Sequence, residues 1–142
     1  MSSTKLGRRR IGREAAIQFL YGQEINPEDR LESLEAFWEV RPIRPEARAF
    51  AEKLIDGVLE HKVEIDTILT EKLENYRMER LAAVDRNILR LAIHEILHCD
   101  DIPAPVSINE AIEIAKRFGS TESSGFVNGL LDSVRKSRPS SS

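Results

Sequence analysis

The sequence predicts an all-α protein, a compact bundle of about seven helices. Apolar residues recur at intervals of three and four along most of the 142 residues, and no segment shows the strict alternation of a β-strand. The chain has only 7 glycines, 6 prolines and 6% aromatic residues, which is unlike a protein of strands and tight turns. Because the breaks between helices are short, we expect antiparallel neighbours within a single domain covering residues 1–142.

The first two helices are marked by an apolar face and by capping residues. The first is expected over residues 8–23, and its apolar face consists of Ile11, Ala15, Ala16, Phe19 and Leu20. The second is expected to begin with Asn26 as N-cap and Pro27 in the first turn, because Asn accepts hydrogen bonds from the exposed N–H groups and Pro lacks one. Pro42 ends it.

Three further helices are expected between Pro45 and the proline-rich break near residue 103. The third starts after Pro45, and the fourth carries the apolar residues from Ile65 to Leu73. The fifth is expected over residues 78–98. It has the widest apolar face, so we expect it at the centre of the domain.

The last two helices follow from a capping pattern and a second apolar run. Ser107-Ile108-Asn109-Glu110 matches a capping box, which predicts Ser107 as the N-cap of the sixth helix. Gly119 is expected as the residue after its end, and the seventh helix carries the apolar residues from Phe126 to Val134. The two ends, residues 1–7 and 137–142, are expected to be flexible.

Composition and charge exclude several classes of protein. With 41% hydrophobic and 32% charged residues the chain is globular, and no apolar run approaches the ~20 residues of a membrane helix. A single cysteine, Cys99, fits a reducing compartment, so we expect a cytoplasmic protein without a membrane partner. The chain carries a net charge of −3 and residues 1–13 alone carry +5, so the remainder carries −8. A basic arm on an acidic body is typical of a nucleic-acid binder that also has a protein partner, although a solvated tail has the same composition.

One motif looks catalytic. His94-Glu95-Ile96-Leu97-His98 matches H-E-x-x-H, in which two histidines bind Zn²⁺ and the glutamate is a general base, so a zinc-dependent peptidase is one alternative. On a helical wheel, however, Glu95 falls on the buried apolar face and the histidines point toward Arg90, whose positive charge disfavours a metal. We therefore expect two partly exposed histidines, a buried hydrogen-bonded Glu95 and no metal.

No other catalytic arrangement is present in the sequence. Cys99 precedes Asp100 and Asp101, whose negative charges disfavour a thiolate, and there is no glycine-rich phosphate-binding loop. We therefore expect a protein that is not an enzyme and has neither a cofactor nor a small-molecule substrate.

The first predicted helix has a polar face suited to RNA. At 100° per residue, Arg10 and Tyr21 lie within about 20° of each other, and Arg13 lies about 60° away. Cationic side chains neutralise phosphates and an aromatic ring stacks on an unpaired base.

Three segments resemble the NusB family of transcription antitermination factors. They are Arg9-Arg10-x-x-Arg13-Glu14-x-Ala16-x-Gln18-x-Leu20-Tyr21; Val84-Asp85-Arg86-x-Ile88-Leu89-Arg90-Leu91-Ala92-x-x-Glu95 with Ile102-Pro103; and Val106-x-Ile108-Asn109-Glu110-Ala111-x-Glu113-x-Ala115-Lys116-x-Phe118-Gly119 with Ser123-x-x-Phe126-Val127-Asn128-Gly129-x-Leu131-Asp132. Only residues 24–78 match weakly.

The resemblance implies an all-helical fold in two small subdomains and a role in ribosomal RNA transcription. Proteins of this family pair with the small-subunit ribosomal protein NusE, bind the single-stranded boxA element of ribosomal RNA leaders and act in the transcription elongation complex. The residues expected to bind RNA are Arg8, Arg9, Arg10, Arg13, Gln18, Tyr21, Ser123, Phe126 and Asn128. The residues expected to contact the protein partner are Glu79, Asp85 and Glu122.

Two other interpretations stay open at this point. One is a NusB-like RNA-binding module of the kind fused to ribosomal RNA methyltransferases, which carry a cofactor-binding domain downstream, whereas this chain ends at Ser142. The other is a helical protein–protein adaptor without RNA contact. The salt dependence of binding distinguishes an adaptor from an RNA binder. For single-stranded RNA, log K falls with log salt with a slope of about 0.7 per phosphate contact.

Overall fold

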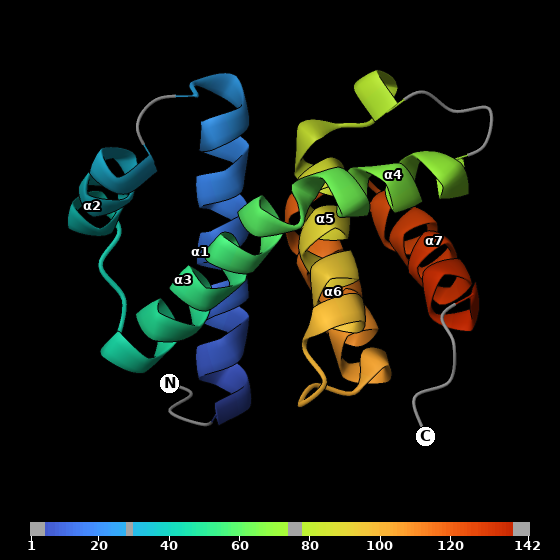
Figure 1. Ribbon diagram of the computed structural model, residues 1–142. Helices are drawn as coiled ribbons and strands as arrows, with labels where there is room; N and C mark the ends of the chain where they lie inside the picture. Colours follow the sequence, from blue (N-terminus) through green and yellow to red (C-terminus); the bar gives the residue numbers. More distant parts are fainter. Residues whose placement is uncertain (1–4, 28–29, 74–77, 138–142) are drawn as a thin grey trace. The chain divides into compact units, whose positions relative to one another are not determined.

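The computed structural model describes residues 5–27, 30–73 and 78–137, and within them all regular structure is helical (Figure 1). The elements are α1 (Lys5–Ile25), α2 (Arg30–Val40), α3 (Pro45–Glu60), α4 (Lys62–Leu73), the 3₁₀ turn η1 (Met78–Arg80), α5 (Ala83–His98), α6 (Ala104–Phe118) and α7 (Ser123–Ser137). The predicted all-α class with about seven helices is confirmed. Of the ends expected to be flexible, residues 1–4 and 138–142 lie outside the described residues, and residues 5–7 and 137 belong to α1 and α7.

The chain forms two compact units, residues 1–57 and 58–142, and the boundary falls inside α3. In the first unit, α1 packs against α2 and closely approaches α3. A Cβ added to Gly12 would lie 2.9 Å from the carbonyl oxygen of Ala47 in α3 and 3.0 Å from the ring of Phe50, so glycine permits this approach. Trp38 of α2 is buried, and its indole N–H donates a 2.9 Å hydrogen bond to Glu52 of α3.

The second unit is built around α5, which packs against α4, α6 and α7. Ile88, Leu89 and Ile93 are fully buried, in agreement with the central position predicted for the most apolar helix. Buried charge also ties α5 to α4, because the guanidinium of Arg90 donates hydrogen bonds of 2.8 and 3.2 Å to the two carboxylate oxygens of Asp66.

Two predicted helix starts are wrong. The N–H of Asn26 donates to the carbonyl of Gly22, so Asn26 continues the hydrogen bonding of α1 and is not the N-cap of α2, which begins at Arg30. The fifth predicted helix is divided: residues 78–80 form the separate turn η1, and α5 begins only at Ala83, after Ala82 in an extended conformation (φ −57°, ψ 137°).

The capping box predicted for the sixth helix is also wrong. Helix α6 begins at Ala104 with Pro103 as N-cap, since Pro105 is tolerated in the first turn. Ser107 therefore lies inside the helix, and its hydroxyl is directed to the core, where it donates to Glu95. Gly119 is the C-cap of α6, with φ −96° rather than a left-handed conformation, and the need for glycine there comes from packing.

None of the described helices combines the length and the apolar character that crossing a bilayer requires.

Candidate functional site

The H-E-x-x-H match has a structural role. Glu95 is 1% exposed, and its carboxylate accepts a 2.7 Å hydrogen bond from the hydroxyl of Ser107, as expected for a buried hydrogen-bonded glutamate. Within the part of the chain that the structure describes, no three His, Cys, Asp or Glu side chains are placed to hold a metal ion. The geometry therefore gives no support to the zinc-peptidase alternative.

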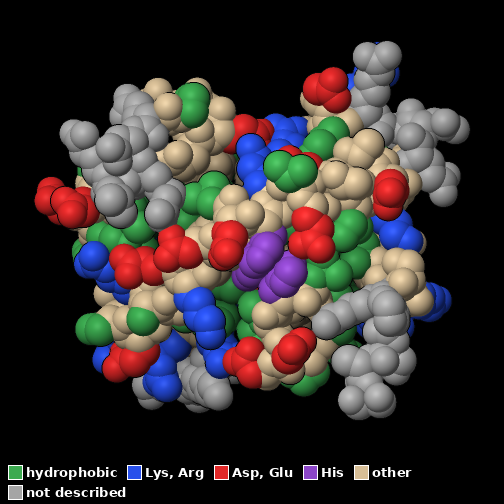
Figure 2. Space-filling view, viewed as in Figure 1, with side chains coloured by type: hydrophobic (Ala, Val, Ile, Leu, Met, Phe, Trp, Pro, Cys, Tyr) green, Lys and Arg blue, Asp and Glu red, His purple; other side chains and the backbone are tan. Residues whose placement is uncertain are grey.

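The three histidines of the chain nevertheless lie together (Figure 2). The rings of His61 and His98 stack with their centroids 3.8 Å apart, and His94 lies 5.7 Å from His61 and 5.6 Å from His98. His98 is partly exposed as expected, but the same expectation is wrong for His94, which is only 5% exposed. Burial, with the nearby His98 and His61, lowers the pKa of His94 to about 4.

Two of the four arginines predicted to bind RNA are directed toward α3. The guanidinium carbons of Arg9 and Arg13 lie 4.9 and 5.2 Å from the centroid of the Phe50 ring, within cation–π distance. Arg13 is 1% exposed, so its guanidinium is enclosed rather than presented to solvent. Arg8 and Arg10 are half-buried and keep part of their side chains at the surface of α1.

The other predicted residues of α1 are on its exposed side. Gln18 is exposed, and Tyr21 is 38% exposed, which is unusual for a large aromatic side chain. Tyr21 is therefore not a core residue, and its ring is accessible to a partner.

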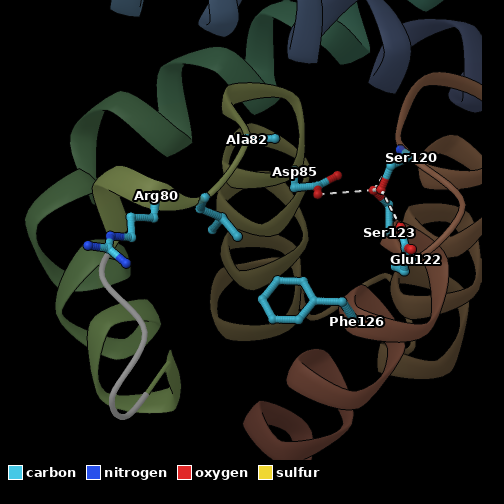
Figure 3. Close-up of a pocket in the computed structure, with 8 residues that line it drawn as sticks. Arg80, Ala82, Asp85, Ser120, Glu122, Ser123 and Phe126 are labelled. Atoms are coloured by element: carbon cyan, nitrogen blue, oxygen red, sulfur yellow. Dashed lines mark hydrogen bonds between the residues drawn. The ribbon is translucent and has the colours of Figure 1, made fainter.

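Four of the remaining predicted residues, Asp85, Glu122, Ser123 and Phe126, line one pocket of about 330 Å³ in the second unit (Figure 3). Its lining is formed by Arg80, Leu81, Ala82, Asp85, Ser120, Glu122, Ser123 and Phe126. These residues come from the end of η1 and the two residues that follow it, from the first turn of α5, from the loop after α6 and from the first turn of α7. Segments far apart in the sequence thus build one pocket.

A short hydrogen-bond chain fixes this pocket. The hydroxyl of Ser123 donates to Oδ2 of Asp85 at 3.0 Å and accepts from the backbone N–H of Ser120 at 2.9 Å. The chain depends on a glycine, because a Cβ on Gly119 would lie 2.5 Å from the Ser123 hydroxyl oxygen. The other carboxylate oxygen of Asp85, Oδ1, is buried and accepts no hydrogen bond within the described protein. Asp85 as a residue lines the pocket, so the pocket holds a carboxylate whose orientation is fixed by Ser123.

The pocket joins residues that were expected to have different roles. Ser123 and Phe126 were expected to bind RNA, and Asp85 and Glu122 to contact the protein partner. Ser123 is buried, Phe126 is half-buried with its ring at the pocket, and Glu122 is exposed. Glu79 and Asn128 are exposed but do not line the pocket.

Sequence reasoning missed two polar residues of this pocket, Arg80 and Ser120. Neither belongs to the three matched segments. The one available signal for Ser120 was its place beside Gly119 at a helix end, where the exposed backbone groups need polar partners.

Comparison with known proteins decides which family these features belong to. The model of the NusB family matches residues 10–136. The chain belongs to the NusB family. It is 48% identical over 133 residues to the transcription antitermination protein NusB of Desulfotalea psychrophila, covering 89% of this chain and 94% of that protein.

Solved NusB structures share the fold. The structure of T. maritima NusB is 40% identical, with a TM-score of 0.83 over 97% of this chain and 94% of that one. The NusB chain in a crystal structure of the antitermination factors NusB and NusE with double-stranded RNA is 27% identical, with a TM-score of 0.84 over 92% of this chain and 98% of that one.

Proposed function

We propose that this NusB-family chain is a transcription antitermination factor, which binds boxA-type single-stranded RNA of ribosomal RNA leaders together with a NusE-type ribosomal protein. It would act in the cytoplasm as part of the transcription elongation complex, without catalysis. The observation that carries the proposal is the fixed pocket at Asp85 and Phe126, in a chain whose fold matches a NusB crystallised with NusE and RNA. Such a pocket combines a carboxylate with an aromatic ring.

The first unit supplies sequence-independent and base-directed RNA contacts. Arg8 and Arg10 meet phosphates at the surface of α1, where each contact releases counterions. Arg9 and Arg13 add positive charge while their guanidinium groups pack on Phe50. The two exposed residues, Gln18 and Tyr21, contact base edges and stack on a base, the contacts by which unpaired RNA is read.

The second unit supplies the partner contacts and part of the RNA contacts. Ribosomal proteins are basic, and the carboxylate of Asp85 at the pocket, together with exposed Glu122 and Glu79, suits lysine or arginine side chains. Phe126 presents its ring to a base, and Asn128 lies exposed two residues further along α7. Ser123 is buried on Asp85, so it acts by positioning that carboxylate and the start of α7.

The RNA contacts are tested by titrating a fluorescent single-stranded boxA RNA with the full chain and its NusE-type partner across a salt series. We expect Arg8→Ala/Arg10→Ala to weaken binding and to reduce the slope of log K against log salt by about 1.4, at about 0.7 per phosphate contact. The control is Arg44→Ala, which removes one positive charge at an exposed arginine before α3 and should leave the slope unchanged. RNA binding absent from every mixture would leave the adaptor interpretation in place.

The partner contact is tested with Asp85→Asn, which retains an acceptor oxygen for Ser123 but removes the charge at the pocket. We expect weaker pairing with the NusE-type protein by isothermal calorimetry, by about ten- to a hundredfold, because losing a charge-assisted hydrogen bond costs about 1.5–3 kcal/mol. Glu71→Gln removes an exposed carboxylate of α4 and serves as the control. Equal affinities for Asp85→Asn and the unmodified chain would contradict the assignment.

A further inference from the structure

A second pocket lies in the first unit, between α1 and α2, and none of the contacts proposed above uses it as a cavity. It encloses about 340 Å³. Phe19 and Phe37 contribute its aromatic wall, and Gln18, Gln23, Asn26 and Ser33 contribute polar groups. This combination of aromatic surface and amide groups defines what the pocket can bind.

The aromatic wall is held rigidly. The rings of Phe19 and Phe37 meet edge to face, with centroids 5.6 Å apart and planes at 74°. Phe37 makes a second such contact with Trp38, at 5.1 Å and 71°, and Trp38 is itself fixed by its hydrogen bond to Glu52. Phe37 is only half-buried, so part of this fixed ring remains accessible at the pocket.

The polar lining consists of neutral groups. Gln18 and Asn26 are exposed, Gln23 and Ser33 are half-buried, and none of the described residues that line the pocket is charged. Among these described residues a phosphate would meet no cation, and an aliphatic side chain of a protein partner would desolvate several amides without bonding to them. A flat ligand with an apolar face and a hydrogen-bonding edge satisfies both surfaces.

We propose that this pocket binds one unstacked nucleobase of the RNA, with adenine preferred. The inference deepens the proposed function and rests on it, because the ligand is part of the RNA already assigned to the chain. The base stacks on the Phe37 side of the pocket, and the amides bond to its edge. Asn and Gln side chains pair in bidentate fashion with N6 and N7 of adenine, which gives adenine its preference.

The location on α1 supports RNA as the source of the ligand. Gln18 lines the pocket and lies one helical turn before the exposed Tyr21. On the helical wheel Arg8 falls within about 20° of Phe19 and lies about 16 Å away along the axis. One strand running along this helix would therefore meet a phosphate contact and the base pocket in turn.

The test fills the pocket without touching the core. Ala36 is exposed and lines the pocket, so Ala36→Phe occupies it, whereas Ala49→Phe adds the same ring to an exposed alanine of α3 outside it. The probes are boxA RNAs that carry a single 2-aminopurine at successive adenine positions, bound to the full chain with its NusE-type partner. We expect one position to change fluorescence on binding, and Ala36→Phe to abolish that change and weaken binding about tenfold.

A second, smaller substitution in the same pocket distinguishes lost base recognition from misfolding of the Ala36→Phe variant. Gln23→Met keeps the length of the side chain but removes its hydrogen bonds, so we expect it to reduce the preference for adenine over uridine at the responsive position. If Ala36→Phe and Gln23→Met both bind RNA with normal affinity while Arg8→Ala/Arg10→Ala still weakens RNA binding, the base pocket is refuted and the proposed function stands. Weakened partner binding with unchanged RNA binding would identify a protein ligand and overturn it as well. Absence of RNA binding by the unmodified complex would overturn the pocket and the proposed function together.

Discussion

Acidification is expected to destabilise the chain through His94. This ring is 5% exposed, and burial together with the nearby His98 and His61 lowers its pKa to about 4, against 6.5 for an ordinary histidine. The thiol of Cys99 lies 3.8 Å from Nε2, and Nδ1 is buried without a hydrogen-bond partner in the described protein. None of these contacts to the His94 ring is made by a negatively charged group. The positive charge of a protonated His94 would therefore not be balanced by them. The carboxylate of Glu64 instead lies 2.8 Å from His98.

The sign and the magnitude follow from proton linkage. Between pH 6.5 and pH 4 the unfolded chain takes up a proton at this residue and the folded chain does not, so stability falls as the pH falls. The difference between a pKa of 6.5 in the unfolded chain and about 4 in the folded chain lowers the free energy of unfolding by about 3 kcal/mol once the pH is below 4. At pH 5, where the unfolded histidine is nearly fully protonated, the loss relative to pH 7.5 is about 2 kcal/mol.

Urea unfolding followed by circular dichroism at pH 7.5, 6 and 5 measures this loss. Replacing the ring in His94→Phe keeps an aromatic side chain of similar shape but removes the titration, so we expect the loss between pH 7.5 and 5 to shrink by about 2 kcal/mol. The control His98→Gln removes a partly exposed histidine and should retain most of the acid sensitivity, because desolvation is the largest cause of the shift. The reasoning is refuted if His94→Phe and the unmodified chain lose the same stability, or if the His94 resonance titrates above pH 6.

Three further substitutions test the packing. Gly12→Ala places a Cβ 2.9 Å from a carbonyl oxygen of α3. Thermal denaturation should therefore show a net loss of about 1–2 kcal/mol in stability, although alanine has the better helix propensity. A gain in stability would contradict the close approach. Gly119→Ala should displace Ser123, and weakened partner binding measured by calorimetry would reveal it, whereas unchanged binding would argue against the positioning role. Arg90→Met removes the two hydrogen bonds that Arg90 donates to Asp66, and it should lower the free energy of unfolding in urea by about 3 kcal/mol. If a double-mutant cycle with Asp66→Asn shows no coupling energy, this ion pair is not the cause of the loss.

Helix interiors were predicted better than helix ends. The apolar period is a property of a whole segment, so α3, α5 and α7 could be expected from residues such as Ile88 and Val134 whatever surrounded them. The ends depend on single hydrogen bonds, for which side chains compete. Ser107 has the sequence of an N-cap, but its hydroxyl donates to the carboxylate of Glu95 on another helix, and the N-cap of α6 is Pro103, four residues earlier.

The candidate site divides in the same way. The residues of interest at Asp85, Ser123 and Phe126 could be named from the matched segments, and their identities alone indicate acceptors and an aromatic surface. From the sequence, Ser123 and Phe126 were assigned to RNA and Asp85 to the protein partner. In the structure all three line one pocket. The contribution of Arg80 could not be inferred, since it depends on the path of the chain before α5.

By itself the sequence determined that this chain is all-helical, that α5 is central to its unit and that Glu95 is buried, because helical period and apolar content are local quantities. Only the tertiary structure decided which polar atoms find partners. Arg13 is enclosed beside Phe50, Ser123 is committed to Asp85, and His94 is buried beside the two other histidines. The physical reason is that hydrogen bonding, desolvation and ring contact act over a few ångströms between residues far apart in the sequence, and folding alone brings those residues together.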